Sequence, residues 1–139
     1  WNNEEETKNA ITSDGWFKTG DIGIMTEAGY PKIVDRKKDM IIISGFNVYP
    51  NEIEEVAMLH EKIFEAGCVG ISNKDGTESI KLFVSLVLGK TLTNQEILEH
   101  CKKNLTGYKL PKNIEFIDEI PKSNVGKILR RELRERKSA

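Results

Sequence analysis

Apolar residues near the start of the chain occur in short runs separated by turn sequences. The runs at 22–25 and 30–34 lie on either side of EAG at 27–29, and SDG occupies 13–15. Short apolar runs that flank a Gly-containing turn predict a β-hairpin. Because an isolated two-stranded hairpin is marginally stable in water, we expect the packing partner of this hairpin to lie elsewhere.

A run of charged residues separates the first hairpin from a more apolar segment. Residues 35–39 (DRKKD) are all charged, so we expect an exposed linker or hinge there and no core element. The β-branched run at 40–44 and the short run at 46–49 predict a second hairpin that turns at Gly45. A proline at the start and apolar residues at helical spacing predict a helix over about 10 residues, 50–60.

Three further segments predict a small sheet. The mostly apolar run at 65–72 ends in the turn NKDG and suits a strand in a sheet interior. Apolar residues occupy every second position from 80 to 88 (Ile80, Leu82, Val84, Leu86 and Leu88), which predicts a strand with one buried face. A short run at 113–117 predicts the last strand.

Two helices complete the pattern. Thr93 followed by Glu96 is the signature of a capping box, and the apolar stripe that follows predicts a helix ended by Gly107. A basic helix with two leucines on one face is expected over 128–137. Strands mixed with helices on one small sheet predict an α+β fold, with a β-hairpin and a short mixed sheet flanked by helices.

Length and composition limit the range of functions. The chain has 139 residues, 38% of them hydrophobic, which allows one compact domain with an appendage. A formal net charge of −1 gives no overall attraction to nucleic acid, so we expect no nucleic-acid partner. No run approaches the roughly 18 apolar residues of a membrane helix, and the first ten residues lack the features of a signal peptide. We therefore expect a cytoplasmic protein, and the polar start suggests a piece of something longer.

The cysteines give no sign of a metal site. Cys68 and Cys101 are the only two, they lie far apart in apolar surroundings, and no histidine is spaced to join them. We expect two buried, reduced thiols and no metal-binding residues.

Charge is unevenly distributed along the chain. From Pro121 onward there are seven Lys or Arg against two acids, so the tail forms a local basic patch. One interpretation is a basic amphipathic helix that contacts anionic lipid or nucleic acid. The i,i+4 pair Glu132–Arg136 favours the alternative of a solvated helix face. Peripheral contact with the inner membrane is left open.

Two clusters contain groups suited to a nucleotide. In GWFKTGD, at 15–21, the carboxylate of Asp21 could accept hydrogen bonds from the vicinal hydroxyls of a ribose, although a simple turn explains the residues equally well. Farther along, Arg36 beside the charged run could bind ribose or phosphate, and Gly45 would let the backbone approach a ligand closely. The simpler interpretation of this second cluster is a solvated charge run followed by a strand pair.

A third cluster, IPKSNVGKILRREL at 120–133, contains Gly126 and Lys127 on a loop before a helix. Such a loop could present an ammonium group to negative charge that develops at a carboxylate or phosphate. A GK pair alone is weak evidence, and the spacing of a P-loop is missing.

Taken in order, the three clusters resemble the adenylate-forming superfamily of acyl-CoA ligases, adenylation domains and luciferases. The resemblance runs from Asp14 to Leu133. The sequences DGWFKTGDIG, IVDRKKDMIIISGFNVYPNEIE, LTGYKLPK and IPKSNVGKILRREL are most similar to bacterial long-chain fatty acid CoA ligases. The resemblance implies that residues 38–139 are the small C-terminal lid domain and that residues 1–37 are the end of the large N-terminal domain.

The resemblance also implies roles for single residues. Asp21 matches the family aspartate that binds the ribose hydroxyls of ATP and AMP, and Arg36 matches the arginine that assists it. Lys38 occupies the hinge position about which the lid rotates. Lys127 matches the lysine that contacts the carboxylate and the α-phosphate during adenylation. Gly45 falls where the family lines the pantetheine tunnel for CoA.

The implied activity belongs to a longer enzyme, which uses ATP, a fatty acid, CoA and Mg²⁺ to form acyl-CoA, AMP and pyrophosphate. The phosphate loop, acyl tunnel and adenine pocket of the family have no counterpart in this sequence. We therefore expect the fragment to be inactive alone, to hold no bound cofactor and to act with a missing N-terminal domain. Two alternatives stay open: the lid of another acyl- or aryl-CoA ligase or adenylation domain, and a non-catalytic binding module with the same fold. Acyl chain length and oligomeric state are not predicted.

Overall fold

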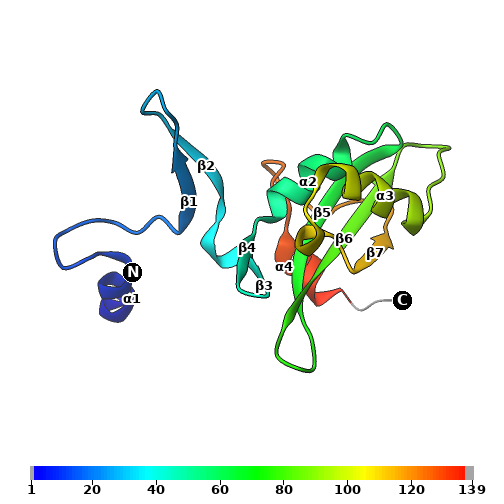
Figure 1. Ribbon diagram of the computed structural model, residues 1–139. Helices are drawn as coiled ribbons and strands as arrows, with labels where there is room; N and C mark the ends of the chain where they lie inside the picture. Colours follow the sequence, from blue (N-terminus) through cyan, green and yellow to red (C-terminus); the bar gives the residue numbers. More distant parts are fainter. Residues whose placement is uncertain (1, 137–139) are drawn as a thin grey trace. The chain divides into compact units, whose positions relative to one another are not determined.

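The computed structural model describes residues 2–136 (Figure 1). The chain divides after Lys38 into two compact units, which are described one at a time. The first unit contains α1 (Glu4–Ala10), β1 (Asp21–Met25) and β2 (Pro31–Arg36). The remaining elements are η1 (Lys37–Asp39), β3 (Ile41–Ile43), β4 (Phe46–Val48), α2 (Pro50–Met58), β5 (Ile63–Ser72), β6 (Glu78–Leu86), α3 (Asn94–Asn104), η2 (Gly107–Lys109), β7 (Asn113–Phe116) and α4 (Arg130–Glu135).

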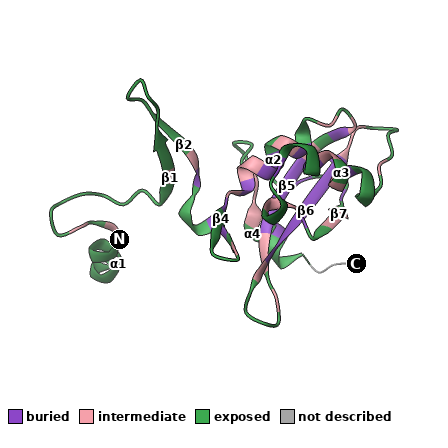
Figure 2. Cartoon of the chain, in the orientation of Figure 1, coloured by how far each residue is buried: buried purple, intermediate pink, exposed green. Residues whose placement is uncertain are grey.

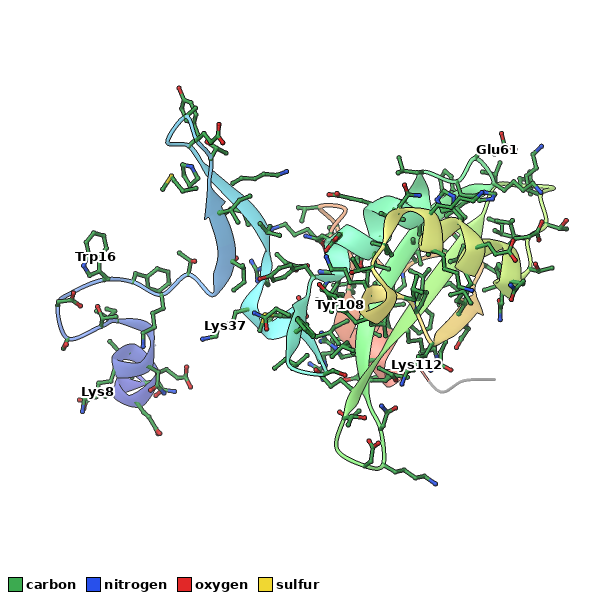
Figure 3. The ribbon with its side chains drawn as sticks, in the orientation of Figure 1. Lys8, Trp16, Lys37, Glu61, Tyr108 and Lys112 are labelled. Carbon is green, nitrogen blue, oxygen red and sulfur yellow. The ribbon has the colours of Figure 1, made fainter. Side chains whose placement is uncertain are left out.

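The first unit is built around the expected hairpin. Strands β1 and β2 pair antiparallel, with Asp21 opposite Arg36 at one end and Met25 opposite Pro31 at the other. The hairpin buries little apolar surface of its own, and the side chain of Trp16 stands clear of the chain (Figure 3). More than half of the surface is exposed in six large apolar residues of this unit: Trp16, Phe17, Ile24, Met25, Tyr30 and Ile33. Exposed apolar surface on this scale is typical of a surface that packs against something else.

Helix α1 was not predicted. It has no buried residue, so it leaves no apolar periodicity in the sequence. Its signals are polar: the Asn3 side chain accepts a hydrogen bond from the Glu6 N–H at 3.1 Å, and three glutamates occupy the first turn. An N-cap and first-turn acids stabilise a helix start.

The second unit is organised on a three-stranded mixed sheet, as expected. Strand β6 lies in the centre, antiparallel to β5 and parallel to β7. The prediction that β6 has one buried face was wrong, because every residue from Ser79 to Ser85 is buried (Figure 2). The apolar residues at every second position predicted one buried face correctly. The other face is buried as well, because a second layer of the structure covers it. The strand also ends at Leu86, and Leu88 is 99% exposed.

Each face of the sheet has its own apolar cluster. Helices α2 and α3 cover one face, and α4 with the segment before it covers the other (Figure 1). The first cluster contains Ile41, Val48, Ile53, Ala57, Ile63, Ala66, Cys68, Ile80, Leu82, Val84, Ile97, Cys101 and Leu105. The second contains Val69, Phe83, Ile117, Ile120 and Leu133. This layered mixture of helices and strands confirms the α+β prediction.

Local signals located the starts of the helices better than their ends. Pro50 is the first residue of α2, and both halves of the Thr93–Glu96 capping box are present. Helix α3 ends at Asn104, before Gly107, which instead begins η2. Helix α4 is shorter than the predicted 128–137, and Lys137 lies outside the described residues.

Both cysteines are buried free thiols, as expected. Burial raises the pKa of the Cys101 thiol to about 11, because the apolar surroundings disfavour the thiolate. Neither side chain is suited to act as a nucleophile near neutral pH.

An ion cluster joins β6, β7 and the residue that follows α4. The Lys81 ammonium lies 2.7 Å from one Glu115 oxygen, and Arg136 Nε donates to the other at 3.0 Å. Lys81 is 8% exposed and also lies over the Phe83 ring. The Lys81 hydrogen bond, assisted by Arg136, lowers the pKa of the Glu115 carboxyl below its ordinary value.

Two leucines provide a matched test of the second apolar cluster. We predict that Leu133→Ala lowers the free energy of unfolding by about 2–5 kcal/mol, because Leu133 is 2% exposed and its removal leaves a cavity. Leu88→Ala removes the same atoms from a 99% exposed side chain and should change stability by less than about 0.5 kcal/mol. Urea unfolding followed by circular dichroism measures both. Equal effects would show that α4 does not pack as described.

The Glu115 cluster predicts a pH dependence. A carboxyl with a lowered folded-state pKa contributes stability above its unfolded pKa, and that stability is lost as the pH falls. Glu115→Gln should therefore cost about 1–2 kcal/mol at pH 7, and the difference from the unchanged chain should shrink once the pH falls below the ordinary value of 4.5. Urea unfolding at several pH values measures it, with the exposed Glu61→Gln as control. A difference that is the same at pH 3 and pH 7 would contradict the assignment.

Candidate functional site

The first candidate residues, Asp21 and Arg36, are brought together by the register of the hairpin. They lie directly opposite each other at the end of β1 and β2, and Arg36 Nε is 3.6 Å from Asp21 Oδ1. The side chain of Asp21 is 30% exposed and that of Arg36 is 56% exposed. A carboxylate held beside a guanidinium, with part of its surface open, can still accept hydrogen bonds from a ligand.

A shallow hollow of about 420 Å³ adjoins this pair. Its lining consists of Thr19, Gly20, Arg36, Lys37 and Lys38. The backbone around it is held by a hydrogen bond from the Asp21 N–H to the Thr19 hydroxyl oxygen and by one from the Lys37 N–H to the Gly20 carbonyl. Three cations and a hydroxyl suit an anionic or polyhydroxyl ligand. The sequence interpretation included Arg36 and Lys38 but missed Thr19 and Lys37.

Gly45 lies at the tip of the second hairpin. The hairpin pairs Ile43 with Phe46, so Ser44 and Gly45 form a two-residue turn, and both have positive φ (50° and 84°). Such turns favour glycine for backbone reasons alone. Space is open beside Gly45, where an added Cβ would meet no atom within 4 Å. Directly after the turn, the Phe46 ring stacks on Tyr108 with centroids 4.8 Å apart.

Lys127 lies on a tight turn. A bridge pairs Lys122 with Ile128, the Ser123 N–H donates to the Lys127 carbonyl at 2.8 Å, and the Gly126 N–H donates to the Ser123 carbonyl at 2.8 Å. Gly126 has φ of +77°, which favours glycine at this position. The Lys127 side chain is exposed. Its ammonium is therefore accessible to a ligand.

The basic tail is not an unpaired basic patch. Its cations other than Lys127 bind acids wherever the structure describes them, in the pairs Lys122–Glu65, Arg130–Glu54, Arg131–Glu135, Arg134–Asp39 and Arg136–Glu115. The expected i,i+4 pair Glu132–Arg136 was wrong, since Arg136 binds Glu115 and the helix pair joins Arg131 to Glu135. Within residues 2–136, the side chain of Lys127 has no ion pair or hydrogen bond to the protein. Lys127 thus differs from the neighbouring cations of this range, because its charge is not paired with an acid.

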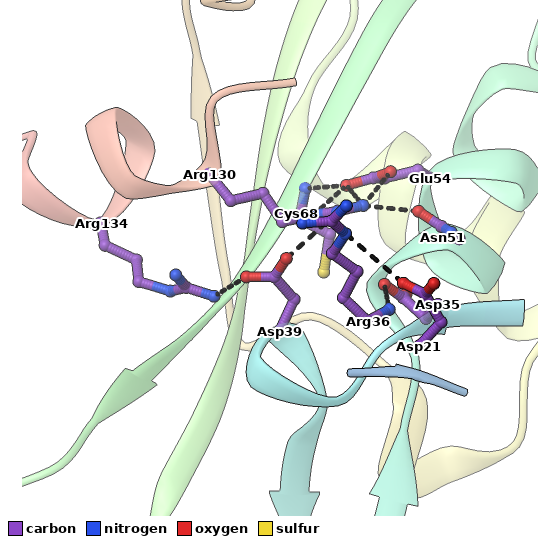
Figure 4. A network of polar contacts seen from close by, with 9 residues as sticks. All are labelled: Asp21, Asp35, Arg36, Asp39, Asn51, Glu54, Cys68, Arg130 and Arg134. Carbon is purple, nitrogen blue, oxygen red and sulfur yellow. Dashed lines mark hydrogen bonds and ion pairs between the residues drawn. The ribbon is translucent and has the colours of Figure 1, made fainter. Parts of the chain in front are cut away.

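A polar network that is largely buried lies where the chain leaves the Lys127 turn and enters α4 (Figure 4). Arg130 binds Glu54 through Nη2 and Oε2 at 2.8 Å, and Arg134 Nη2 binds Asp39 Oδ1 at 2.7 Å. The expectation that residues 35–39 form an exposed run was wrong for both aspartates, since Asp35 is 3% and Asp39 7% exposed. The burial of Asp39 is tolerated because the arginines of α4 neutralise it.

The sequence analysis missed this network, although it left a signal. Glu54 falls on the buried stripe of α2 together with Ile53 and Ala57. Arg130 and Arg134 are spaced to share a face of α4 with the buried Leu133. A charged residue on the apolar face of a helix is rarely buried without a partner, so these residues could have been matched with each other.

Two kinds of feature are absent from the part of the chain that the structure describes. Among residues 2–136, no three His, Cys, Asp or Glu side chains come together in a way that could hold a metal ion. Over the same range, no helix has the length and apolar character needed to cross a membrane.

Comparison with known proteins places the chain in a family. The family model described as the AMP-binding enzyme C-terminal domain matches residues 52–127, just over half of the chain. A long-chain-fatty-acid–CoA ligase from Yersinia pestis is 56% identical over 135 residues, which are 97% of this chain and 24% of the relative. The chain thus spans about a quarter of the length of that relative.

Solved structures agree. ATP-bound MatB from Rhodopseudomonas palustris matches with a TM-score of 0.91 at 35% identity, over 97% of this chain and 27% of that one. The o-succinylbenzoate CoA synthetase MenE from Bacillus subtilis, in complex with an acyl-adenylate intermediate, matches with a TM-score of 0.85 at 32% identity, over 98% of this chain and 28% of that one. The protein belongs to the family of AMP-binding enzyme C-terminal domains.

Proposed function

We propose that this chain is the C-terminal part of a long-chain fatty acid CoA ligase and that Lys127 supplies the ammonium group for adenylation. Residues 38–139 would form the mobile lid, and residues 1–37 would end the large N-terminal domain. The whole enzyme converts ATP, a fatty acid and CoA into acyl-CoA, AMP and pyrophosphate. The observation that carries the proposal is the exposed, unpaired Lys127 on its tight turn.

The first half-reaction explains the need for this ammonium group. A fatty acid carboxylate oxygen attacks the α-phosphorus of ATP, the bond to the bridging oxygen of the β-phosphate breaks, and pyrophosphate leaves. No proton is transferred, but negative charge accumulates on the reacting oxygens. The Lys127 ammonium would donate hydrogen bonds to the carboxylate and to the α-phosphate, which lowers the barrier electrostatically.

The nucleotide is held by the first unit in this proposal. Asp21 accepts hydrogen bonds from the ribose hydroxyls, and Arg36, 3.6 Å away, orients the carboxylate and adds positive charge. The hollow lined by Thr19, Lys37 and Lys38 adjoins the pair and offers further donors. We assign no residue of this chain to binding the Mg²⁺ ion that accompanies ATP.

The second half-reaction needs a different lid surface. The CoA sulfur, after loss of its proton, attacks the acyl carbonyl carbon, and the bond to the phosphate oxygen breaks to release AMP. The open side of the Gly45 turn leaves room for the pantetheine arm. Rotation about Lys38 would exchange the two lid surfaces, and closure would exclude water that hydrolyses the adenylate.

The long-chain substrate is favoured by sequence similarity. The Yersinia pestis long-chain ligase is 56% identical to the chain, whereas MatB and MenE are 35% and 32% identical. The lid of another acyl- or aryl-CoA ligase is the second candidate, since these structures share the same fold. The acyl tunnel, which would decide between them, lies outside this chain.

The role of Lys127 can be tested in a chimera, in which this chain replaces its matching region in the Yersinia pestis ligase. We predict that Lys127→Ala lowers adenylation about 100-fold, because one preorganised charge donor is lost. Thioester formation from supplied acyl-AMP and CoA should largely survive. Pyrophosphate release measures the first half-reaction, and acyl-CoA formation measures the second.

Lys74→Ala serves as the matched control for that experiment, because Lys74 is an exposed lysine on another turn of the same unit. It should leave both half-reactions unchanged. Equal losses in the two half-reactions for Lys127→Ala would overturn the assigned role.

Asp21 gives an independent prediction for the nucleotide. In the same chimera, Asp21→Asn should raise KM for ATP about 10- to 100-fold, because hydrogen bonds to a charged acceptor are weakened. Asp75→Asn, in the turn between β5 and β6, is the control and should not change it. An unchanged KM for ATP would place the ribose elsewhere.

A further inference from the structure

The turn that carries Lys127 is held at both ends. On one side, Lys122 binds Glu65 of β5. On the other side, the Leu129 N–H donates to the Pro121 carbonyl at 2.8 Å, and Arg130 follows at the start of α4. The position of the Lys127 backbone therefore depends on where these two ends are anchored.

The Arg130 guanidinium is the deeper of the two anchors. Its side chain is 12% exposed, and its Nε and Nη2 donate to Glu54 Oε1 and Oε2 at 3.3 and 2.8 Å. Nη2 also donates to Asn51 Oδ1 at 2.5 Å. Glu54 is fixed in turn, because its Oε1 accepts from the Cys68 N–H of β5 at 2.8 Å. Residues of α2 and β5 thus hold the guanidinium fork in one orientation (Figure 4).

The same network reaches the residue that follows the proposed hinge. Asp39 Oδ2 lies 3.8 Å from Arg130 Nη1, and Asp39 Oδ1 accepts from Arg134 at 2.7 Å. Asp39 comes directly after Lys38, and Arg130 comes three residues after Lys127. A short chain of ion pairs therefore joins the start of the lid to the Lys127 turn.

Burying the three charges of Arg130, Glu54 and Asp39 is a costly way to stabilise a fold. Desolvation offsets most of the attraction within a buried ion pair, and well-packed apolar residues of the same volume often stabilise a protein as well or better. Directional hydrogen bonds, however, fix relative positions more tightly than apolar contacts do. The arrangement is suited to holding Lys127 at a constant place relative to the hinge.

We propose that Arg130 is a positioning residue for adenylation, which acts through Lys127 by fixing its turn to Glu54, Asn51 and Asp39. The inference rests on the proposed function of Lys127. When the lid rotates about Lys38, this network makes the Lys127 turn move rigidly with Asp39. The ammonium group then arrives at the α-phosphate in one place, and no separate ordering of the turn is needed.

The experiment uses the chimera with the Yersinia pestis ligase. Arg130→Gln should lower kcat for adenylation about 10- to 100-fold, the scale expected when a reacting group is misplaced by a small distance. Thioester formation from supplied acyl-AMP and CoA should change less than about 3-fold, because that half-reaction does not use the Lys127 ammonium in the proposed function. Arg131→Gln removes an arginine whose side chain is 86% exposed on the same helix and should leave both half-reactions unchanged. Arg130→Lys should restore adenylation only in part, because one ammonium cannot reproduce the fork.

A double variant separates positioning from other roles. If Arg130 acts through Lys127, then Arg130→Gln combined with Lys127→Ala should adenylate no more slowly than Lys127→Ala alone. Independent effects would instead multiply, and that result would overturn the proposal.

Arg130→Gln leaves Glu54 as a buried charge, so a milder variant is needed as well. Asn51→Ala removes one acceptor of the guanidinium and leaves the ion pair in place. It should lower adenylation selectively, by a few fold, with little change in Tm. Loss of both half-reactions in proportion, together with a lower Tm, would mean that the network only supports the fold and would overturn the inference.

The outcomes also separate this inference from the proposed function. A Lys127→Ala variant that still adenylates would defeat the proposed function. Selective loss in Lys127→Ala with unchanged adenylation in Arg130→Gln would defeat only the positioning role.

Discussion

The ion pair between Arg130 and Glu54 is the contact on which the second unit depends. It joins α4 to α2 and, through the Cys68 N–H, to β5. With side chains 12% and 6% exposed, neither charge could stay in place without the other. Helix α4 has six residues and is too short to be stable in isolation. Its position must therefore come from these tertiary contacts.

Apolar packing gives α4 a second attachment. A Cβ added at Gly67 would lie 2.7 Å from Leu133 Cδ1 and 3.4 Å from Ile120 Cγ2, so β5 has room for the leucine only because residue 67 is glycine. Leu133 and Arg130 are spaced to lie on the same side of the helix. The ion pair and the leucine together fix both the orientation and the depth of α4, and the Lys127 turn is fixed with it.

Much of the fold was predictable because its signals are local. The Gly-containing turn after β1, the proline at the start of α2 and the capping box of Thr93 each depend on residues a few positions apart. The errors concern features that depend on distant residues. The second buried face of β6 requires α4, which follows more than forty residues later, and the burial of Asp39 requires Arg130 and Arg134. A run of charges looks solvated until its partners are known.

The candidate site divides in the same way. Asp21, Arg36 and Lys127 came from resemblance to a family, and the structure adds that β-strand register sets the first two 3.6 Å apart. Glu54 and Arg130 each share a helix face with buried apolar residues, which signals that each needs a partner, but 76 residues separate them and the sequence does not show that they bind each other. Their partnership exists only in the folded chain.

Charge neutralisation in the tail supports the role proposed for Lys127. A cation surrounded by free cations would compete with them for the same anion and would be repelled by them. Here the neighbouring cations Lys122, Arg130 and Arg134 are bound to Glu65, Glu54 and Asp39. Their charge is cancelled locally, while their hydrogen bonds hold the turn rigid. Among the tail cations that the structure describes, Lys127 is thereby left as the unpaired charge on an anchored turn, and a charge held in place in this way can stabilise a transition state electrostatically.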